Sequence, residues 1–174
     1  TELLYSMSAL IDARSQSMFA IDSSSGLVTT TTRLDREFMD VHYLRITVTD
    51  SSNPPKSATT TLQINVQDEN DHVPMFEHAN YEASLKESVP IGTTVLTLRA
   101  TDQDSGSNSD IEYSILNPTG INEAFRIDSK AGSIITRAIL DREKNDLYTI
   151  TVQASASGPL QSRKRSQTSV GIKI

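Results

Sequence analysis

The chain has 174 residues, of which 36% are hydrophobic, 5% are aromatic and none is cysteine or tryptophan. This composition allows one large or two small domains with apolar cores, and it excludes thiolate zinc sites and thiol catalysis. The net charge of −6, from 16 basic and 22 acidic residues, is a poor match to nucleic acid, which is bound by basic surfaces.

Segments with a period of two residues run along the whole chain. The clearest strands, which alternate apolar and polar side chains, are residues 43–49, 60–66 and 94–100. Turn signals rich in Pro, Gly and Asn separate the strands, at residues 53–55, 90–92, 117–120 and 157–159. No stretch has convincing helical spacing, apart from a short helical turn around residues 123–125. Short strands at this spacing predict an all-β sandwich.

The sequence repeats itself after 106 residues. Phe-x-Ile-Asp at Phe19 returns at Phe125, and Leu-Asp-Arg-Glu at residues 34–37 returns at residues 140–143. The shift becomes 108 farther from these motifs, where residues 3–7 and 62–66 match residues 111–115 and 170–174. Several motifs in one order at one period predict two tandem units.

Four residues inside the repeated motif have a structural interpretation. Asp22 and Asp128 occupy positions at which Asx turns favour aspartate, and Gly26 and Gly132 follow where a positive φ is expected. We therefore expect these residues to form turns rather than ligand sites.

The two units are unequal in extent. Residues 74–174 form a complete repeat, whereas residues 1–67 begin at the equivalent of Ser109, so that about 35 residues have no counterpart before Thr1. We expect residues 1–67 to be a partial repeat that lacks its first strands and residues 68–73 to be a linker.

Acidic residues gather in short motifs, at residues 35–37, 68–72, 87, 102–108 and 141–143. Calcium takes six to eight oxygen ligands, and these motifs contain only hard oxygen donors. Asp-x-Asp and Asp-Arg-Glu on extended backbone place two carboxylates on one side of the chain. A single Asp-Arg-Glu is more often surface salt-bridge chemistry, so the metal interpretation depends on the motifs together.

Taken together, the motifs resemble the cadherin superfamily. Asp68-x-Asn70-Asp71-His72-x-Pro74-x-Phe76 is similar to the linker between cadherin repeats, and residues 34–37, 100–108, 113–115 and 125–134 resemble other signatures in the family's order. The form Asp-x-Asp-Ser-Gly-x-Asn is closer to protocadherins and giant, non-junctional cadherins than to short junctional ones. The resemblance covers the whole chain and implies tandem seven-strand Greek-key β-sandwiches, cadherin/immunoglobulin-like, with the first repeat incomplete.

The resemblance also implies that two or three Ca²⁺ ions bind at the linker. The ligands carried over are Asp35 and Glu37 from the first repeat, the Glu69 carbonyl, the Asn70 side chain, the Asp71 carboxylate and the His72 carbonyl from the linker, and Asp102, Asp104 and the Asn108 carbonyl from the second repeat. The His72 side chain is then a solvated linker group. Half-sites for neighbouring linkers would be Asp50, Glu87, Asp141 and Glu143.

One position departs from the family pattern. The aspartate that closes the third calcium site is matched by Asp50 in the first unit but falls at Ala156 in the second. We therefore expect the outermost ion to bind weakly or to be missing.

The function implied by the resemblance is calcium-dependent cell–cell adhesion or recognition, by calcium-rigidified repeats of a membrane-anchored ectodomain at the extracellular face of the plasma membrane. The partners would be another cadherin ectodomain, homophilic or heterophilic, and neighbouring repeats, with the membrane reached only through segments outside this sequence. The alternative is a structural spacer, which a uniformly polar sheet face favours, whereas an exposed apolar patch favours recognition. No enzyme is expected, because His42, His72 and His78 are not spaced as a catalytic or metal pair.

One basic cluster, Arg163-Lys164-Arg165, follows Gly158-Pro159 and several serines. The interpretation with more weight is a solvated hairpin loop. A contact with a heparan-type surface is the alternative.

Overall fold

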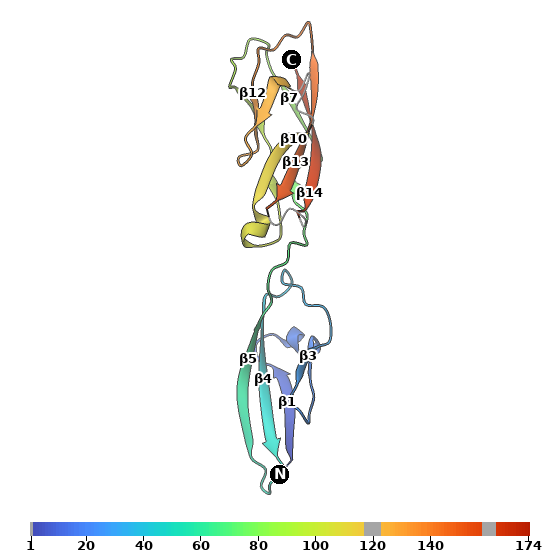
Figure 1. Cartoon of the computed structure of the whole chain (residues 1–174), viewed down its shortest axis with the longest axis vertical. Coiled ribbons are helices and arrows are strands. Elements are labelled where there is room, and N and C mark those ends of the chain that lie inside the picture. The colour runs from blue at the N-terminus through green and yellow to red at the C-terminus, as the bar shows by residue number, and fades with distance from the viewer. Residues whose placement is uncertain (1, 117–122, 158–162) are drawn as a thin grey trace. The chain divides into compact units, whose positions relative to one another are not determined.

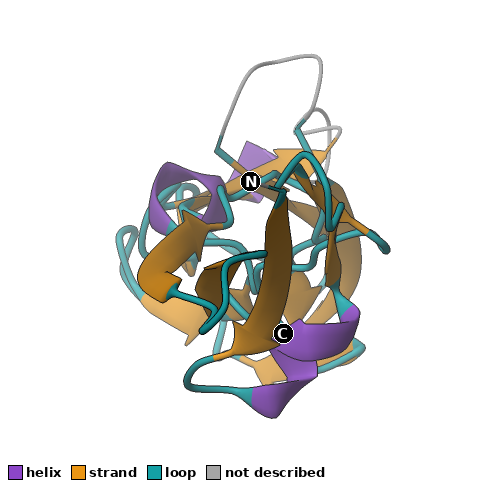
Figure 2. Ribbon diagram, turned by 90° about the horizontal axis from the view of Figure 1, so that it is seen from below, coloured by secondary structure: helices purple, strands orange, loops and turns teal. Residues whose placement is uncertain are grey.

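The structure is a computed structural model that describes residues 2–116, 123–157 and 163–174. The chain divides into two compact units, Thr1–Asp68 and Glu69–Ile174. Strands dominate both units, and the helical segments are short 3₁₀ turns (Figures 1 and 2). Within the described ranges no helix has the length and apolar character needed to cross a bilayer. The turns expected at residues 117–120 and 158–159 lie outside the described residues.

The first unit is built on a sheet in which β4 lies between β1 and β5. Its elements are β1 (Leu3–Ala9), η1 (Ala13–Ser17), β2 (Phe19–Ile21), β3 (Val28–Thr30), β4 (Val41–Asp50) and β5 (Ser57–Asn65). All pairings are antiparallel, including that of β2 with β3. Alternation along β4 turns His42 and Leu44 inward, 1% and 0% exposed, to pack with Phe19 in the core. The His42 and Phe19 rings meet edge to face at 5.0 Å.

The second unit has a larger set of strands. They are β6 (Met75–Phe76), β7 (Asn80–Ser84), β8 (Thr94–Thr97), β9 (Ala100–Thr101), β10 (Ile111–Leu116), β11 (Phe125–Ile127), β12 (Ser133–Thr136), β13 (Leu147–Ala156) and β14 (Arg165–Lys173), with η2 (Gly106–Ser109). One sheet has the order β10-β13-β14-β7, another β11-β12-β8, and β6 pairs with β9. The β14–β7 pairing is parallel and the others are antiparallel.

The sheet β10-β13-β14-β7 has one apolar and one polar face, because side chains alternate along its strands. Its inner face contributes to a core that includes Tyr113, Tyr148, Ile150, Val152, Ala154, Val170 and Ile172. Its outer face carries cross-strand rows of polar residues, such as Ser114, Gln153 and Gln167. A two-sided sheet of this kind needs one opposing layer, which β11-β12-β8 supplies.

The prediction of an all-β fold is confirmed, with two differences in detail. The strand expected at residues 94–100 is split, because β8 ends at Thr97 and pairs with β12, whereas β9 pairs with β6. Within the described residues, the helical turn expected at residues 123–125 covers residues 123–124, since Phe125 already starts β11. The 3₁₀ segments η1 and η2 were not predicted, since single turns leave no periodic pattern.

The Asx turn expected at Asp22 is present. Its Oδ1 accepts hydrogen bonds from the N–H and hydroxyl of Ser24 (3.0 and 2.7 Å) and of Ser25 (2.7 and 2.9 Å), while Gly26 closes the turn with a φ of 72°. These donors, first the Ser24 hydroxyl and then the Ser25 N–H, hold the pKa of Asp22 well below its ordinary value. The carboxylate is therefore a structural acceptor.

We expect the pKa of Asp22 to rise toward its ordinary value of about 3.9 when Ser24 and Ser25 are both changed to alanine, because two hydroxyl donors are lost. Carboxyl-carbon NMR titration measures the change directly. Since the folded-state pKa is lowered, the stabilisation exists above the unfolded value and is lost as the pH falls through the folded value. An unchanged titration midpoint in the double variant would contradict this account.

Candidate metal centre

The linker segment of the second unit presents an amide oxygen without a protein partner. The Asn70 Nδ2 donates to the backbone carbonyl of Ser157 at 3.0 Å, which fixes the direction of the side chain. Its Oδ1 is buried and has no hydrogen-bond partner among the described residues. Burying an amide oxygen without a partner costs free energy, so this atom is available to coordinate a metal ion.

Two aspartates of one bend lie close to this linker. Asp104 is 5% exposed, and its N–H donates to the Asp102 Oδ1 at 3.0 Å, which folds the two carboxylates into one turn. The Asp102 Oδ2 is buried and lacks a partner among the described residues. The hydroxyl of Tyr113 accepts from the Ala100 N–H at 2.8 Å and anchors the strand that leads into this bend. The fold thus buries carboxylate oxygens here without satisfying all of them.

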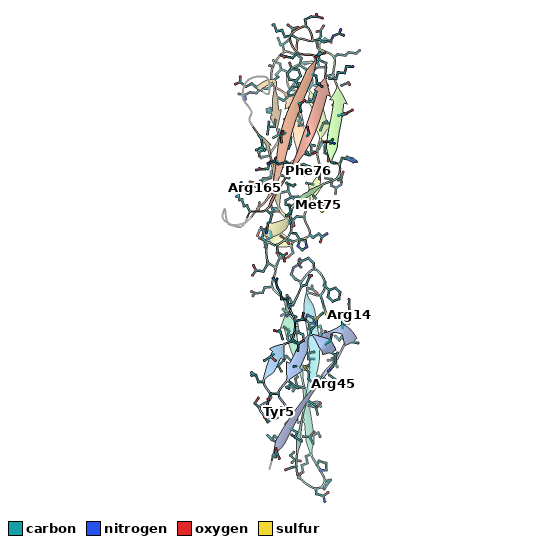
Figure 3. All side chains as sticks on the ribbon, turned by 90° about the vertical axis from the view of Figure 1, so that its right-hand side faces the viewer. Tyr5, Arg14, Arg45, Met75, Phe76 and Arg165 are labelled. Atoms are coloured by element: carbon teal, nitrogen blue, oxygen red, sulfur yellow. The ribbon has the colours of Figure 1, made fainter. Side chains whose placement is uncertain are left out.

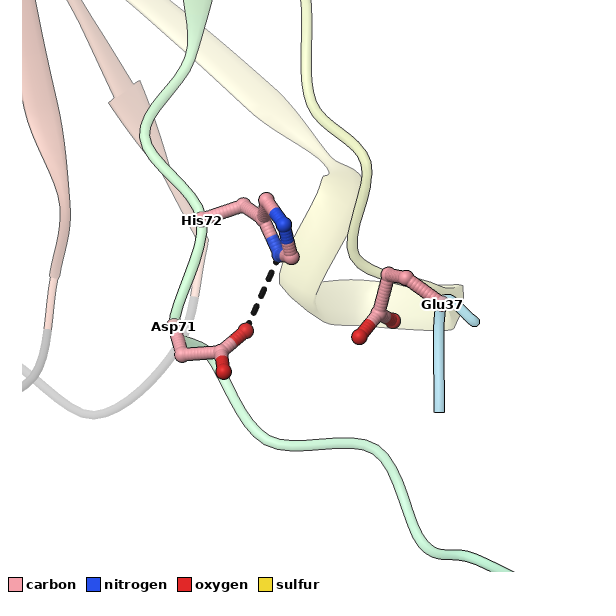
Figure 4. Close-up of side chains that lie close together, drawn as sticks. All are labelled: Glu37, Asp71 and His72. Atoms are coloured by element: carbon pink, nitrogen blue, oxygen red, sulfur yellow. Dashed lines mark ion pairs between the residues drawn. The ribbon is translucent and has the colours of Figure 1, made fainter. Parts of the chain in front are cut away.

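From the sequence we expected the His72 side chain to be a solvated linker group. In the structure it instead contacts two carboxylates. Its Nδ1 lies 2.8 Å from the Asp104 Oδ1 and 2.9 Å from the Asp71 Oδ1, the contact drawn in Figure 4. The His72 N–H also points to the Asp104 carboxylate, 3.3 Å from Oδ1. The Asp104 side chain is fully buried and requires donors, and the adjacent linker supplies them.

These second-unit residues fit calcium as a donor set. Asn70, Asp71, Asp102 and Asp104 supply amide and carboxylate oxygens, and Asn108 lies in η2, directly after the Asp102–Asp104 bend. Hard oxygen donors of this type are what Ca²⁺ takes, and the two orphaned buried oxygens are the specific observation that favours an ion. Glu69 is exposed and contributes its carbonyl to the Asp71 N–H at 2.9 Å.

Ala156 lies at the end of β13 that faces this segment of the second unit. It is 0% exposed, it pairs with Ile111, and its neighbour Ser157 receives the hydrogen bond from Asn70. No carboxylate can come from this position. The Ser157 carbonyl instead contacts the linker, a role that the sequence did not reveal because backbone acceptors leave no sequence signal.

The predicted ligands of the first unit lie on a turn. Asp35 accepts from the Phe38 N–H at 2.9 Å, and residues 36–38 form the turn that follows it. The extended backbone expected for this motif is therefore wrong, as it is for residues 142–144, which also form a turn. Arg36, the middle residue of the motif, pairs with Glu37 Oε1 and Asp68 Oδ1, both at 2.6 Å.

The Arg36–Asp68 pair was not predicted. It connects the Leu-Asp-Arg-Glu turn to the last residue of the first unit, and so it fixes where the linker begins. The arginine of the motif has a positioning role that the spacing of acids alone could not show, because the pair spans 32 positions.

In the second unit, the predicted half-site residue Glu87 lies close to the turn that contains Asp141 and Glu143. The Glu87 Oε2 accepts from the Arg142 N–H at 3.3 Å, which brings the Glu87 side chain to the Asp141–Glu143 turn. Asp141 is bonded by Lys144, whose side chain is the main cause of the lowered pKa of Asp141. In the first unit Asp50 caps its own hairpin, accepting from the Lys56 N–H at 2.8 Å and from Ser52.

A serine–histidine contact exists in the first unit, but it is part of the core. The Ser15 Oγ lies 2.9 Å from the His42 Nδ1, and both residues are 1% exposed. A nucleophile needs a substrate within reach, and neither group is reachable from solvent. The contact satisfies two buried polar side chains.

Comparison with known proteins gives a consistent result. The cadherin domain family matches residues 4–67 and 81–174. The chain is 51% identical over 181 residues to the protocadherin-like wing polarity protein stan of Drosophila melanogaster, covering 99% of this chain. It is 43% identical over 160 residues to the human cadherin EGF LAG seven-pass G-type receptor 3, covering 90% of this chain. The chain spans 5% of the length of each of these relatives.

Solved structures of related repeats share the fold. Mouse cadherin-23 EC22-24 superposes with a TM-score of 0.89 at 28% identity, over 98% of this chain and 53% of that one. The protocadherin gammaB7 EC3-6 cis-dimer gives 0.85 at 29% identity, over 99% and 40%. These neighbours consist of cadherin repeats, which are Greek-key β-sandwiches, and the predicted fold class is thereby confirmed.

Proposed function

We propose, from the premise that this chain belongs to the cadherin family, that its two units are calcium-stiffened repeats of an adhesion ectodomain. Cadherin repeats of adhesion receptors serve adhesion or recognition and are generally calcium-binding, and the chain is not an enzyme. The proposal assigns two or three Ca²⁺ ions to the linker, with ligands from Asp35, Glu37, residues 69–72, Asp102, Asp104 and Asn108.

The single observation that supports this proposal most is the pair of orphaned oxygens in the second unit. The Asn70 Oδ1 and the Asp102 Oδ2 are buried with no partner among the described residues. Native structures pair nearly all such atoms, with protein, water or an ion. Carboxylate and amide oxygens facing one segment call for a hard cation rather than for another hydrogen-bond donor.

Charge explains what the residues do. Carboxylates crowded within a Debye length of about 8 Å repel one another unless they are neutralised. In the Asp102–Asp104 bend the Asp104 N–H donates to the Asp102 carboxylate, and in the first unit Arg36 pairs with both Glu37 and Asp68. Calcium, when bound, supplies the positive charge that the remaining carboxylates lack, so the linker segment becomes rigid.

The test is calorimetric titration of Ca²⁺ into the two-unit chain, with thermal melting and small-angle scattering in parallel. We expect two or three ions, a higher melting temperature and a longer particle, with Kd of roughly 10⁻⁴ to 10⁻³ M. If no calcium binds, and neither calcium nor chelator changes the melting temperature or the scattering, the proposed calcium-dependent function is wrong.

Replacing Ala156 with aspartate is expected to raise the number of bound ions by one. A carboxylate at this fully buried position is unpaired without metal, so we also expect a lower melting temperature in chelator and its recovery in calcium. Calorimetry and melting measure both effects, and Ala156→Asn is the uncharged control. If Ala156→Asp stays destabilised in calcium and the ion count is unchanged, Ala156 does not explain a weak third site.

A structural spacer is the second candidate, and one observation favours it. The outer face of β10-β13-β14-β7 consists mainly of polar and charged side chains, with Ser114, Gln153 and Gln167 forming one of its rows. Leu147, 57% exposed, is at one end of this face. Recognition surfaces are usually marked by larger apolar patches, so this face of the second unit suits a spacer.

Location and partners belong to the same proposal. The relatives named above are membrane receptors or polarity proteins by name, and their similarity supports an extracellular position on the plasma membrane. The expected partner is another cadherin ectodomain, homophilic or heterophilic, together with the neighbouring repeats of the same chain. Cell-aggregation assays with and without this pair of repeats distinguish an adhesive role from a spacer role.

A further inference from the structure

A basic surface in the second unit lies outside the proposed calcium ligands. It consists of Lys130, in the turn between β11 and β12, and of Arg163, Lys164 and Arg165, which lead into β14. Figure 3 labels Arg165 at the start of that strand. We call these four residues the basic patch. The fold thus places cations from separate parts of the sequence in one region of a chain whose net charge is −6.

One carboxylate organises the basic patch. The Glu112 Oε1 lies 3.1 Å from the Lys130 Nζ, and its Oε2 lies 3.9 Å from a terminal nitrogen of Arg163. Glu112, Ser155 and Arg165 are successive members of one cross-strand row, so Arg165 is on the same face, about 10 Å from Glu112 at ordinary strand spacing. The Glu112 carboxylate thus lies close to Lys130 and Arg163, and Lys130 and Arg165 are exposed.

The first unit shows that the fold does not require these charges. The cross-strand row that matches Glu112 and Arg165 contains Leu4 and Ser57 there. The turn position of Lys130 is Ser24, and of the three residues 163–165 only Lys164 has a basic counterpart, Lys56. Since the same architecture forms without them, the cations add a property to the surface rather than stability to the sandwich.

We propose that the basic patch binds a sulfated polysaccharide. Guanidinium and ammonium groups spread over about 10 Å of an open face suit a chain that carries several anionic groups. The next row on the same face, Ser114, Gln153 and Gln167, offers amide and hydroxyl groups that suit sugar hydroxyls.

Two other polyanions fit the surface less well. Neither the basic patch nor this row contains an aromatic side chain on which a nucleobase would stack. Neither contains a large apolar side chain that would enter a bilayer. The basic patch therefore favours a sulfated sugar chain over single-stranded nucleic acid or an anionic membrane.

The test uses immobilised heparin and the two-unit chain at near-physiological salt, with binding measured in calcium and in chelator. We expect Lys130→Ser/Arg165→Ser, which introduces the residues of the first unit, to weaken binding about tenfold, because each exposed ion pair contributes a few-fold. Glu112→Gln removes the competing carboxylate and is expected to strengthen binding a few-fold. Thermal melting of each variant verifies that the fold is intact, and Lys130→Ser alone serves if the double variant melts early.

Matched controls make the outcome decisive. Lys86→Ser/Lys173→Ser and Glu82→Gln change the same charges elsewhere in the second unit, with Lys173 and Glu82 on the far half of the same sheet, and should leave binding within about twofold. No heparin binding, equal losses in the control variants, or equal binding to desulfated heparin, single-stranded DNA or phosphatidylserine vesicles would each overturn the proposal. Because no basic-patch residue is a proposed calcium ligand, loss of calcium binding alone leaves this test interpretable.

Discussion

Asp104→Asn is expected to abolish most of the rise in melting temperature that calcium produces. The Asp104 side chain is fully buried and is held by the N–H and Nδ1 of His72. Asparagine keeps the shape but removes the charge that a cation needs. Saturating calcium at a hundredfold excess over Kd stabilises a fold by about 2.7 kcal/mol, and most of this increment should disappear. Melting curves with calcium and with chelator measure it.

The control for this variant is Asp110→Asn. Asp110 is an exposed carboxylate just after η2 and is not a proposed ligand. We expect it to keep the calcium response. In chelator, Asp104→Asn should melt at or above the unmodified protein, because a buried unneutralised carboxylate is itself costly. An undiminished calcium response in Asp104→Asn would remove this residue from the site.

Gly132→Ala is expected to destabilise the second unit by about 3 kcal/mol, with a fall in melting temperature of about 15 °C. Gly132 has a φ of 69°, and an added Cβ would lie 2.5 Å from the Leu98 carbonyl oxygen. The same backbone is fixed by the hydrogen bond from the Leu98 N–H to the Gly132 carbonyl. Neither atom can move without breaking the contact between β8 and the turn before β12. Calorimetric unfolding measures the loss.

Gly92→Ala separates the two causes of that loss. Gly92 has a φ of 91° but nothing lies within 4 Å of an added Cβ, so its variant reports the backbone cost alone, about 1 kcal/mol. A large difference between the two variants is therefore expected. If they are equally destabilised, the close approach to Leu98 is relieved by a shift of the chain and does not limit stability.

Sequence periodicity predicted the long strands because their side chains alternate between core and solvent. The apolar side chains of β4 and β13 are therefore visible in the sequence, as are the Asx turns at Asp22 and Asp128, which need particular residue types. The break between β8 and β9 was not visible. It depends on which sheet each backbone segment joins, because β8 pairs with β12 and β9 pairs with β6.

The acidic motifs and their residue types could be read from the sequence alone. They indicated an oxygen-donor site because carboxylate and amide side chains do not pack in an apolar core. Only the tertiary structure decided how they are held. In the folded chain Arg36 forms an ion pair with Asp68, 32 positions away, and the His72 imidazole contacts the buried Asp104 carboxylate. The fold also brings Lys130 and Arg163 to Glu112. Such contacts are determined by strand register and turn geometry, which bring together side chains that no local pattern connects.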